Sequence, residues 1–257
     1  DNGGPTKSHA LDTNSPALDA GNSVIISPPA TDQRGFIRIS GNAIDIGAVE
    51  DQGNRLFVDT TSDIVDGNVI SIAELLNNRG PDDRISLSEA ILASNNTPGS
   101  DVIRFDAIVN KVPIDVTIKG DGEDAAATGD LDVTDDLDLI GNGSTLTLID
   151  AATLGDRVFH ILPGVSVEIS GVTIGGGIAD STEYGGGILV RSSSLHLGGS
   201  VVSDNQAGYG AGVAVLSGFG DASLTLVDST IEDNVAEFSG GGLAINSLVD
   251  GDVIASS

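Results

Sequence analysis

A repeat in the second half of the chain limits the folds that the protein can adopt. Residues 195–205 match residues 224–234 at an offset of 29 residues without a gap, and an earlier copy begins 28 residues upstream, at Val167. After each copy, a glycine cluster leads into a run of apolar residues. These runs are Gly185-Gly186-Gly187-Ile188-Leu189-Val190, Gly210-Ala211-Gly212-Val213-Ala214-Val215 and Gly240-Gly241-Gly242-Leu243-Ala244-Ile245. A period of about 20–50 residues is typical of solenoids and propellers.

Each repeat holds three short alternating strands separated by turn residues, and no helical period. This pattern predicts an all-β fold, a right-handed parallel β-helix, over residues 111–257. Its coils stack at the strand spacing of about 4.8 Å, so equivalent residues lie above one another. Asn205 and Asn234 are therefore expected to form an asparagine ladder. Tyr209 and Phe238 align just before the glycine clusters, and we expect them to stack as structural aromatics in preference to forming a sugar-binding platform.

The residues upstream of the repeats have a different character. A capping box from Ser86 to Glu89 predicts a helix within residues 84–96, and a weaker one from Ser71 to Glu74 predicts a short helix through Asn77. A helix beside the first coils would cover the open end of the sheets. Strand-like runs follow at 101–105, 112–118, 131–133, 137–140 and 145–149. Residues 1–50 are rich in turn residues without a period, which predicts a small irregular β module.

Charge and composition exclude several classes of protein. The chain has 38 acidic and 11 basic residues and a formal net charge of −27, which would repel nucleic acid. With 39% hydrophobic residues, the chain is not expected to be disordered. Zero cysteines exclude disulfides, thiol catalysis and cysteine-ligated metals. No apolar run has the roughly 18 residues of a membrane-spanning helix.

The acidic residues offer one candidate ligand, structural calcium. A dense group within residues 121–138 repels itself at neutral pH, and a bound divalent cation would relieve this repulsion. The alternative is that the acidic residues form a solvated, salt-tolerant surface that keeps the protein soluble. The candidate ligands in this group are Asp121, Glu123, Asp124, Asp130, Asp132, Asp135 and Asp136. A second candidate is the loop 78–89, where Asp82 and Glu89 have EF-hand-like spacing. The alternative for Glu89 is that it only completes the capping box.

Several motifs resemble those of a known group of proteins. Ser15-Pro16-Ala17-Leu18-Asp19-Ala20-Gly21-Asn22 and Asp45-Ile46-Gly47-Ala48-Val49-Glu50 are similar to the closing module called choice-of-anchor Q. Residues 56–106, centred on Ile85-Ser86-Leu87-Ser88-Glu89-Ala90-Ile91, resemble the opening module called the CSLREA domain, although Ser88 stands where that pattern usually has Arg. The Gly-Gly-Gly and Asp-Asn repeats are similar to polymorphic outer-membrane protein repeats. The resemblance implies a secreted or surface-displayed bacterial β-helix protein without a known chemistry.

The domain organisation that we expect is an anchor-Q-like module at 1–52, an opening cap with one or two short helices at 53–110, and coils at 111–257. In the proteins that the chain resembles, the closing module comes last, whereas here it comes first. The sequence is thus expected to be cut out of phase from something periodic. Copies would then join head to tail, either in one long chain or as subunits, and extend into an extracellular fibre.

Three functions remain open at this point. The first is a non-enzymatic structural or adhesive module of an extracellular protein, an adhesin or a filament piece, and we expect this one. The second is a carbohydrate-active enzyme, a polysaccharide lyase or hydrolase, for which Asp204 and Asp233 would lie on adjacent coils. Both also occupy a repeated turn, where a structural role explains them. The third is a module that binds surface glycans without turnover. His160 lies in an apolar run and is expected to be hydrogen-bonded in the core or at its edge.

Overall fold

The computed structural model describes residues 15–17, 20–22, 31–33, 44–49, 55–120, 124–218, 220–247 and 252–256. The chain divides into two compact units, Asp1–Gly53 and Asn54–Ser257. Most of residues 1–50 lie outside the described residues, including residues 18, 19 and 50 of the two choice-of-anchor Q motifs. Where the first unit is described, the Gly21 amide donates to the Ile44 carbonyl at 2.6 Å, and the Ile46 amide donates to the Ala17 carbonyl at 2.9 Å.

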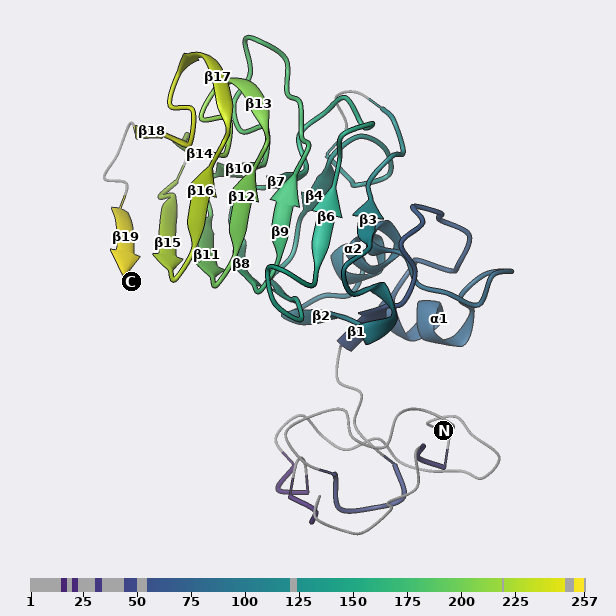
Figure 1. The fold of residues 1–257 in the computed structure, drawn as a ribbon. Helices are drawn as coiled ribbons and strands as arrows, with labels where there is room; N and C mark the ends of the chain where they lie inside the picture. Colours follow the sequence, from purple (N-terminus) through teal and green to yellow (C-terminus); the bar gives the residue numbers. More distant parts are fainter. Residues whose placement is uncertain are drawn as a thin grey trace. The chain divides into compact units, whose positions relative to one another are not determined.

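The second unit is a parallel β-solenoid, so the predicted all-β solenoid is confirmed (Figure 1). Its first sheet runs β1 (Arg55–Val58), β2 (Asp101–Phe105), β5 (Leu137–Ile140), β8 (Ser166–Ser170), β11 (Ser194–Gly198), β15 (Ser223–Val227) and β19 (Asp252–Ser256). The second runs β3 (Pro113–Asp115), β6 (Leu148–Asp150), β9 (Thr173–Gly175), β12 (Val201–Ser203) and β16 (Thr230–Glu232). The third runs β4 (Leu131–Val133), β7 (Phe159–Ile161), β10 (Ile188–Arg191), β14 (Val213–Ser217) and β18 (Leu243–Ser247).

The repeats of the sequence are coils of this solenoid. Leu195 pairs with Val167 on one side and Leu224 on the other, and every strand pair of the three sheets is parallel. Between the second and third sheets, β13 (Gln206–Tyr209) and β17 (Val235–Ser239) form a two-stranded sheet. The inward side chains of successive coils stack into one apolar core, because an alternating strand places every second residue on the same face.

Two short helices and a 3₁₀ turn precede or interrupt the first coils: α1 (Ile72–Asn77), α2 (Leu87–Asn95) and η1 (Ala107–Val109). The capping box of α2 forms as predicted, with Ser86 as the N-cap and Glu89 at the third helical position. Ser71 caps α1 by accepting a hydrogen bond from the Glu74 amide. Among the residues that the structure describes, no helix combines the length and apolar character needed to cross a membrane.

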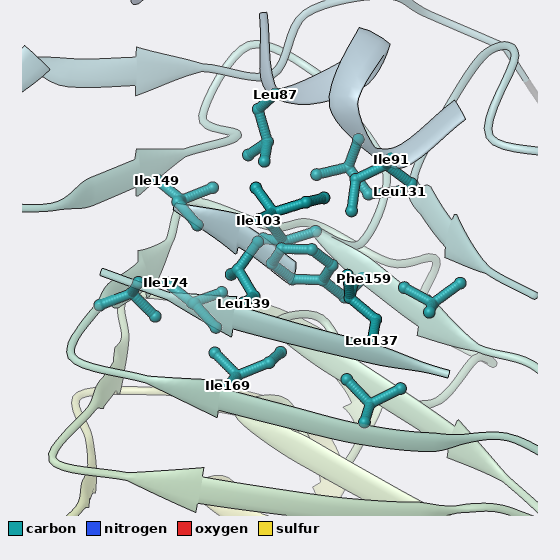
Figure 2. Packing of buried hydrophobic residues seen from close by; sticks show 14 of the residues in the cluster. Leu87, Ile91, Ile103, Leu131, Leu137, Leu139, Ile149, Phe159, Ile169 and Ile174 are labelled. Carbon is teal, nitrogen blue, oxygen red and sulfur yellow. The ribbon is translucent and has the colours of Figure 1, made fainter. Parts of the chain in front are cut away.

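The helix α2 closes the solenoid at the end opposite to β17 and β18 (Figure 1). Leu87 and Ile91 point from α2 onto the stacked core residues Ile103 and Leu131 (Figure 2). The Asn95 amide group donates to the Asp132 carbonyl at 2.8 Å and accepts from the Thr134 amide at 2.9 Å. The helix therefore satisfies backbone groups at the edge of β4, which would otherwise be open to pairing with another strand.

The predicted asparagine ladder is present. The Asn205 side chain is completely buried, and its nitrogen donates to the Asn234 Oδ1 at 2.9 Å. Its Oδ1 accepts from the Gly177 amide of the preceding coil at 2.9 Å. The Asn234 nitrogen reaches back to the Val202 carbonyl at 2.8 Å. One side chain per coil thus binds the bend of its own coil to that of the coil before it.

Two predicted strands are shorter or shifted. The run 112–118 forms only β3, because the Asp63 carboxylate accepts the amides of Thr117 and Ile118 beyond it. The run 145–149 starts late, as β6, because the Leu146 and Thr147 amides bond to the Gly143 carbonyl in a turn. The opening cap and the coils also overlap: β1 and β2, within residues 53–110, already belong to the first sheet.

Replacing Asn205 with alanine should lower the free energy of unfolding by at least about 2 kcal/mol, because the buried Gly177 amide loses its acceptor and the ladder is cut. Urea unfolding measures this. The neighbouring Asp204→Asn variant is the control: Asp204 is exposed with a φ of 58°, which asparagine tolerates, so the change should stay within about 0.5 kcal/mol. Equal losses in both variants would contradict the ladder's role.

Candidate functional site

A buried acid–imidazole pair lies on the outer side of the third sheet. Asp132 of β4 and His160 of β7 are paired in register, and both alternate outward between residues of the core. Both are nevertheless buried. The His160 Nδ1 lies 3.1 Å from the Asp132 Oδ1 and 3.6 Å from the Asp124 Oδ1. The other Asp132 oxygen accepts the Ala126 amide at 3.0 Å, so the loop containing Asp124 and Ala126 is bound to the pair.

The pair determines which nitrogen of His160 carries a proton. A carboxylate can only accept hydrogen bonds, so we assign a proton to Nδ1 facing Asp132. The other nitrogen, Nε2, is shielded from solvent and has no hydrogen-bond partner within the described part of the chain. It acts as an acceptor when the ring is neutral and as a donor when the ring is protonated.

A second charged group lies beside this pair. Arg157 contacts the Asp130 carboxylate at 3.1 Å and also bonds to Glu183. Burial, and then the charge of Asp132, raise the pKa of Asp130 to about 7, against a smaller opposing effect of Arg157. Near neutral pH the Asp130 carboxyl is therefore only partly ionised, whereas a solvated aspartate would be fully ionised.

A groove with a volume of about 420 Å³ borders the same face. It includes Asp124 and Tyr184 from the connecting loops, and one or more residues from each of four strands or their ends. The strand residues that concern its chemistry are His160, Arg191, Ser217 and Asn246. The Ser217 Oγ is buried and has no hydrogen-bond partner among the described residues, but Ser217 is in phase with the core residues Val213 and Val215 and so lies on the inward face of β14. The volume is in the range of small-molecule sites, about 300–1,000 Å³.

The predicted aromatic stack is confirmed and is longer than expected. The rings of Tyr209 and Phe238 are 5.1 Å apart between centroids, and Tyr184 stacks on Tyr209 at 4.9 Å. Tyr184 was not among the predicted residues, although its place immediately before Gly185 matches that of Tyr209 before Gly210. Gly185, Gly210 and Gly240 follow the three rings and all have positive φ, so each coil turns back towards the third sheet at the same point.

The residues of the predicted calcium group are spread over several parts of the solenoid. Asp121 and Glu123 lie outside the described residues. Asp135 accepts the Gly99 amide at 3.0 Å, and Asp136 accepts the Ser166 amide at 2.8 Å, so these two act in turns near the first sheet. Asp130 is paired with Arg157. Asp124 and Asp132 do lie together, and with His160 they offer three ligand atoms within 4.8 Å of one another.

The other predicted calcium residues, Asp82 and Glu89, have local roles. The Asp82 carboxylate accepts the Arg84 amide at 2.9 Å. Glu89 is buried, and its two oxygens accept the amides of Asp66, Gly67 and Ser86. These bonds support the alternative in which Glu89 completes the capping box, and they also show it holding the preceding loop against α2.

Two carboxylate pairs bear on the hydrolase alternative. Asp204 and Asp233 are exposed and occupy equivalent turns, with φ values of 58° and 52°; Asp204 also borders a second groove, of about 410 Å³. Sequence reasoning missed the other pair, Asp138 of β5 and Glu168 of β8, which are opposite in register on the first sheet. Burial and then the Glu168 charge raise the pKa of Asp138. The sequence signal that could have identified this pair is the separation of 30 residues between Asp138 and Glu168, which is about one coil.

Comparison with protein-family models, with curated proteins and with solved structures found no match for this chain. The resemblance to choice-of-anchor Q and CSLREA modules therefore rests on the sequence motifs alone.

The raised pKa of Asp130 predicts a pH dependence of stability. Because its folded pKa of about 7 exceeds the ordinary aspartate pKa of 3.8, the folded state binds more protons between these pH values. Its contribution to stability is therefore present below pH 3.8 and declines as the pH rises to 7, by about 4 kcal/mol at most. Asp130→Asn should remove this component from urea-unfolding profiles taken from pH 4 to pH 8.

The control is Asp221→Asn, at an exposed position, which should keep the wild-type profile. A profile of Asp130→Asn that parallels the wild type would show that the Asp130 carboxyl does not titrate in this range in the folded protein.

Proposed function

We propose that this chain is a non-enzymatic structural or adhesive module of an extracellular or surface-displayed bacterial protein. The observation that carries the proposal is the use of the repeated polar residues: they bind coil to coil. Besides the asparagine ladder, Ser200 accepts the Val172 amide of the preceding coil at 3.3 Å, and Ser229 accepts the Ser200 amide at 3.1 Å. Repeated polar residues that hydrogen-bond one coil to the next stabilise the stacking of the coils. Such a repeat is suited to form a rigid, extended structural element.

The surface charge is consistent with this role. The formal net charge of −27 favours solubility and opposes binding to nucleic acid. The location outside the cell and the bacterial origin rest on the resemblance given above. Association with further copies, head to tail, also stays a prediction. It is supported by the apolar side chains of Val235, Phe238 and Ile245, which are exposed on β17 and β18 and which another stacked coil would bury.

Incubation with polysaccharides tests the proposal against the enzyme alternative. With pectin and alginate we expect neither new reducing ends nor unsaturated products, because the coil-spaced pair Asp204 and Asp233 serves as turn residues. Cleavage by the wild-type protein that Asp204→Ala or Asp138→Asn abolishes would overturn the non-enzymatic proposal. Circular dichroism of each variant checks that the solenoid is folded.

We also propose that a structural divalent cation binds at Asp124 and Asp132, as the acidic composition predicts for calcium. Calcium at one hundred times its Kd should stabilise the fold by about 2.7 kcal/mol, and Asp124→Asn should remove this gain. Differential scanning calorimetry with added calcium or chelator measures it, and Asp221→Asn is the matched control. A melting temperature that is unchanged after verified metal removal refutes the site. Stabilisation by zinc at lower concentrations would identify calcium as the wrong ion.

A further inference from the structure

We propose that the groove on the outer side of the third sheet binds a neutral, linear oligosaccharide. This inference rests on the adhesive role proposed above and supplies its ligand. The groove-lining residues His160, Arg191, Leu216 and Asn246 come from β7, from the end of β10, from β14 and from β18. These are four successive strands of one sheet, so the groove runs along the solenoid axis.

The length of the groove suits a chain molecule. Four strands at a spacing of about 4.8 Å extend over about 14 Å from the first to the last. Several linked sugar rings span such a length, and His160, Arg191 and Asn246 then contact successive parts of the ligand. The volume of about 420 Å³ is partly open to solvent, which suits a segment of a longer polymer.

One unpartnered group indicates a hydroxyl as the chemistry recognised. The His160 side chain is 7% exposed and its Nε2 has no hydrogen-bond partner in the described ranges. Leaving such a group unbonded costs free energy, which a ligand group would recover. A sugar hydroxyl both donates and accepts, so it satisfies Nε2 in either protonation state of the ring.

The remaining lining fits the apolar faces of sugar rings. Leu162, Pro163 and Leu216 line the groove beside Tyr184. The Tyr184 ring packs on Tyr209 with one face, so it is held in place by the aromatic stack. A rigid aromatic ring with nearby aliphatic groups provides contact area at a low entropic cost, and the surrounding polar groups determine the orientation of the ligand.

The charges favour a neutral ligand. Asp124 and Arg191 border the groove with opposite charges, and Asp132 faces the imidazole of His160. The groove thus has no excess of positive charge that would attract a carboxylate or sulfate polymer. The net charge of −27 would also slow the approach of a polyanion.

Nuclear magnetic resonance of the histidine rings tests the inference directly. The chain has three histidines, and His196 lies on β11 of the first sheet, away from the third. Titration of the intact chain with maltohexaose, cellohexaose and mannohexaose should shift the His160 ring resonances, with saturation at millimolar concentrations or below, and leave those of His196 unchanged. His160→Gln and His196→Gln spectra assign the signals.

Affinity measurements with variants complete the test. Arg191→Ala and Asn246→Ala should each weaken binding of the best hexasaccharide about tenfold in calorimetric titration, and His196→Gln should leave it unchanged. The wild-type titration keeps the proposal falsifiable if a variant fails to fold. No shift of His160 with any of the three hexasaccharides overturns the inference, as does tighter binding of hexagalacturonate than of the neutral sugars.

The result of the binding experiment can be distinguished from the result of the test for catalysis. Binding at His160 without cleavage supports both proposals, and cleavage of the bound sugar supports the groove while overturning the non-enzymatic role. Absence of binding removes the ligand assigned here and leaves the structural role in place.

Discussion

Parallel pairing of each coil with the next is the constraint on which the other features of this structure depend. It places residues about 28–30 positions apart in the chain beside one another, at about 4.8 Å. A residue that can bond or pack with its own kind is then repeated along the axis. The Asn205–Asn234 ladder, the hydrogen bond from the Ser200 amide to the Ser229 hydroxyl and the Tyr184–Tyr209–Phe238 stack all follow from this geometry.

The same pairing creates the like-charge contacts that an acidic chain must tolerate. Asp138 and Glu168 are opposite in register, and the pKa of Asp138 is raised. Asp130 immediately precedes β4 and lies two residues from Asp132 along the chain; burial, and then the charge of Asp132, raise the pKa of Asp130 to about 7. Arg157 and His160 relieve part of the repulsion. Buried acids on this face are thus compensated by one cation and one imidazole from the next coil.

Closure of the first coils illustrates how far local signals extend. The capping box at Ser86 and Glu89 predicted the helix, and the predicted covering of the open end by a helix agrees with the structure. The sequence did not indicate that the Glu89 oxygens would also hold the Asp66–Gly67 loop, because that contact joins residues 22 and 23 positions apart without a repeated motif. Likewise, Asp63 ended β3 early through a bond across 55 residues.

The sequence by itself determined the solenoid, its period and its ladders, because these depend on the identity of residues at one repeated offset. Only the tertiary structure decided which outward residues become buried. Asp132 and His160 alternate outward as surface residues do, and it is the loop carrying Asp124 and Ala126 that covers them. The groove depends equally on loops and strand ends meeting over four coils. Loop conformation has no period, so a repeat pattern carries no information about it.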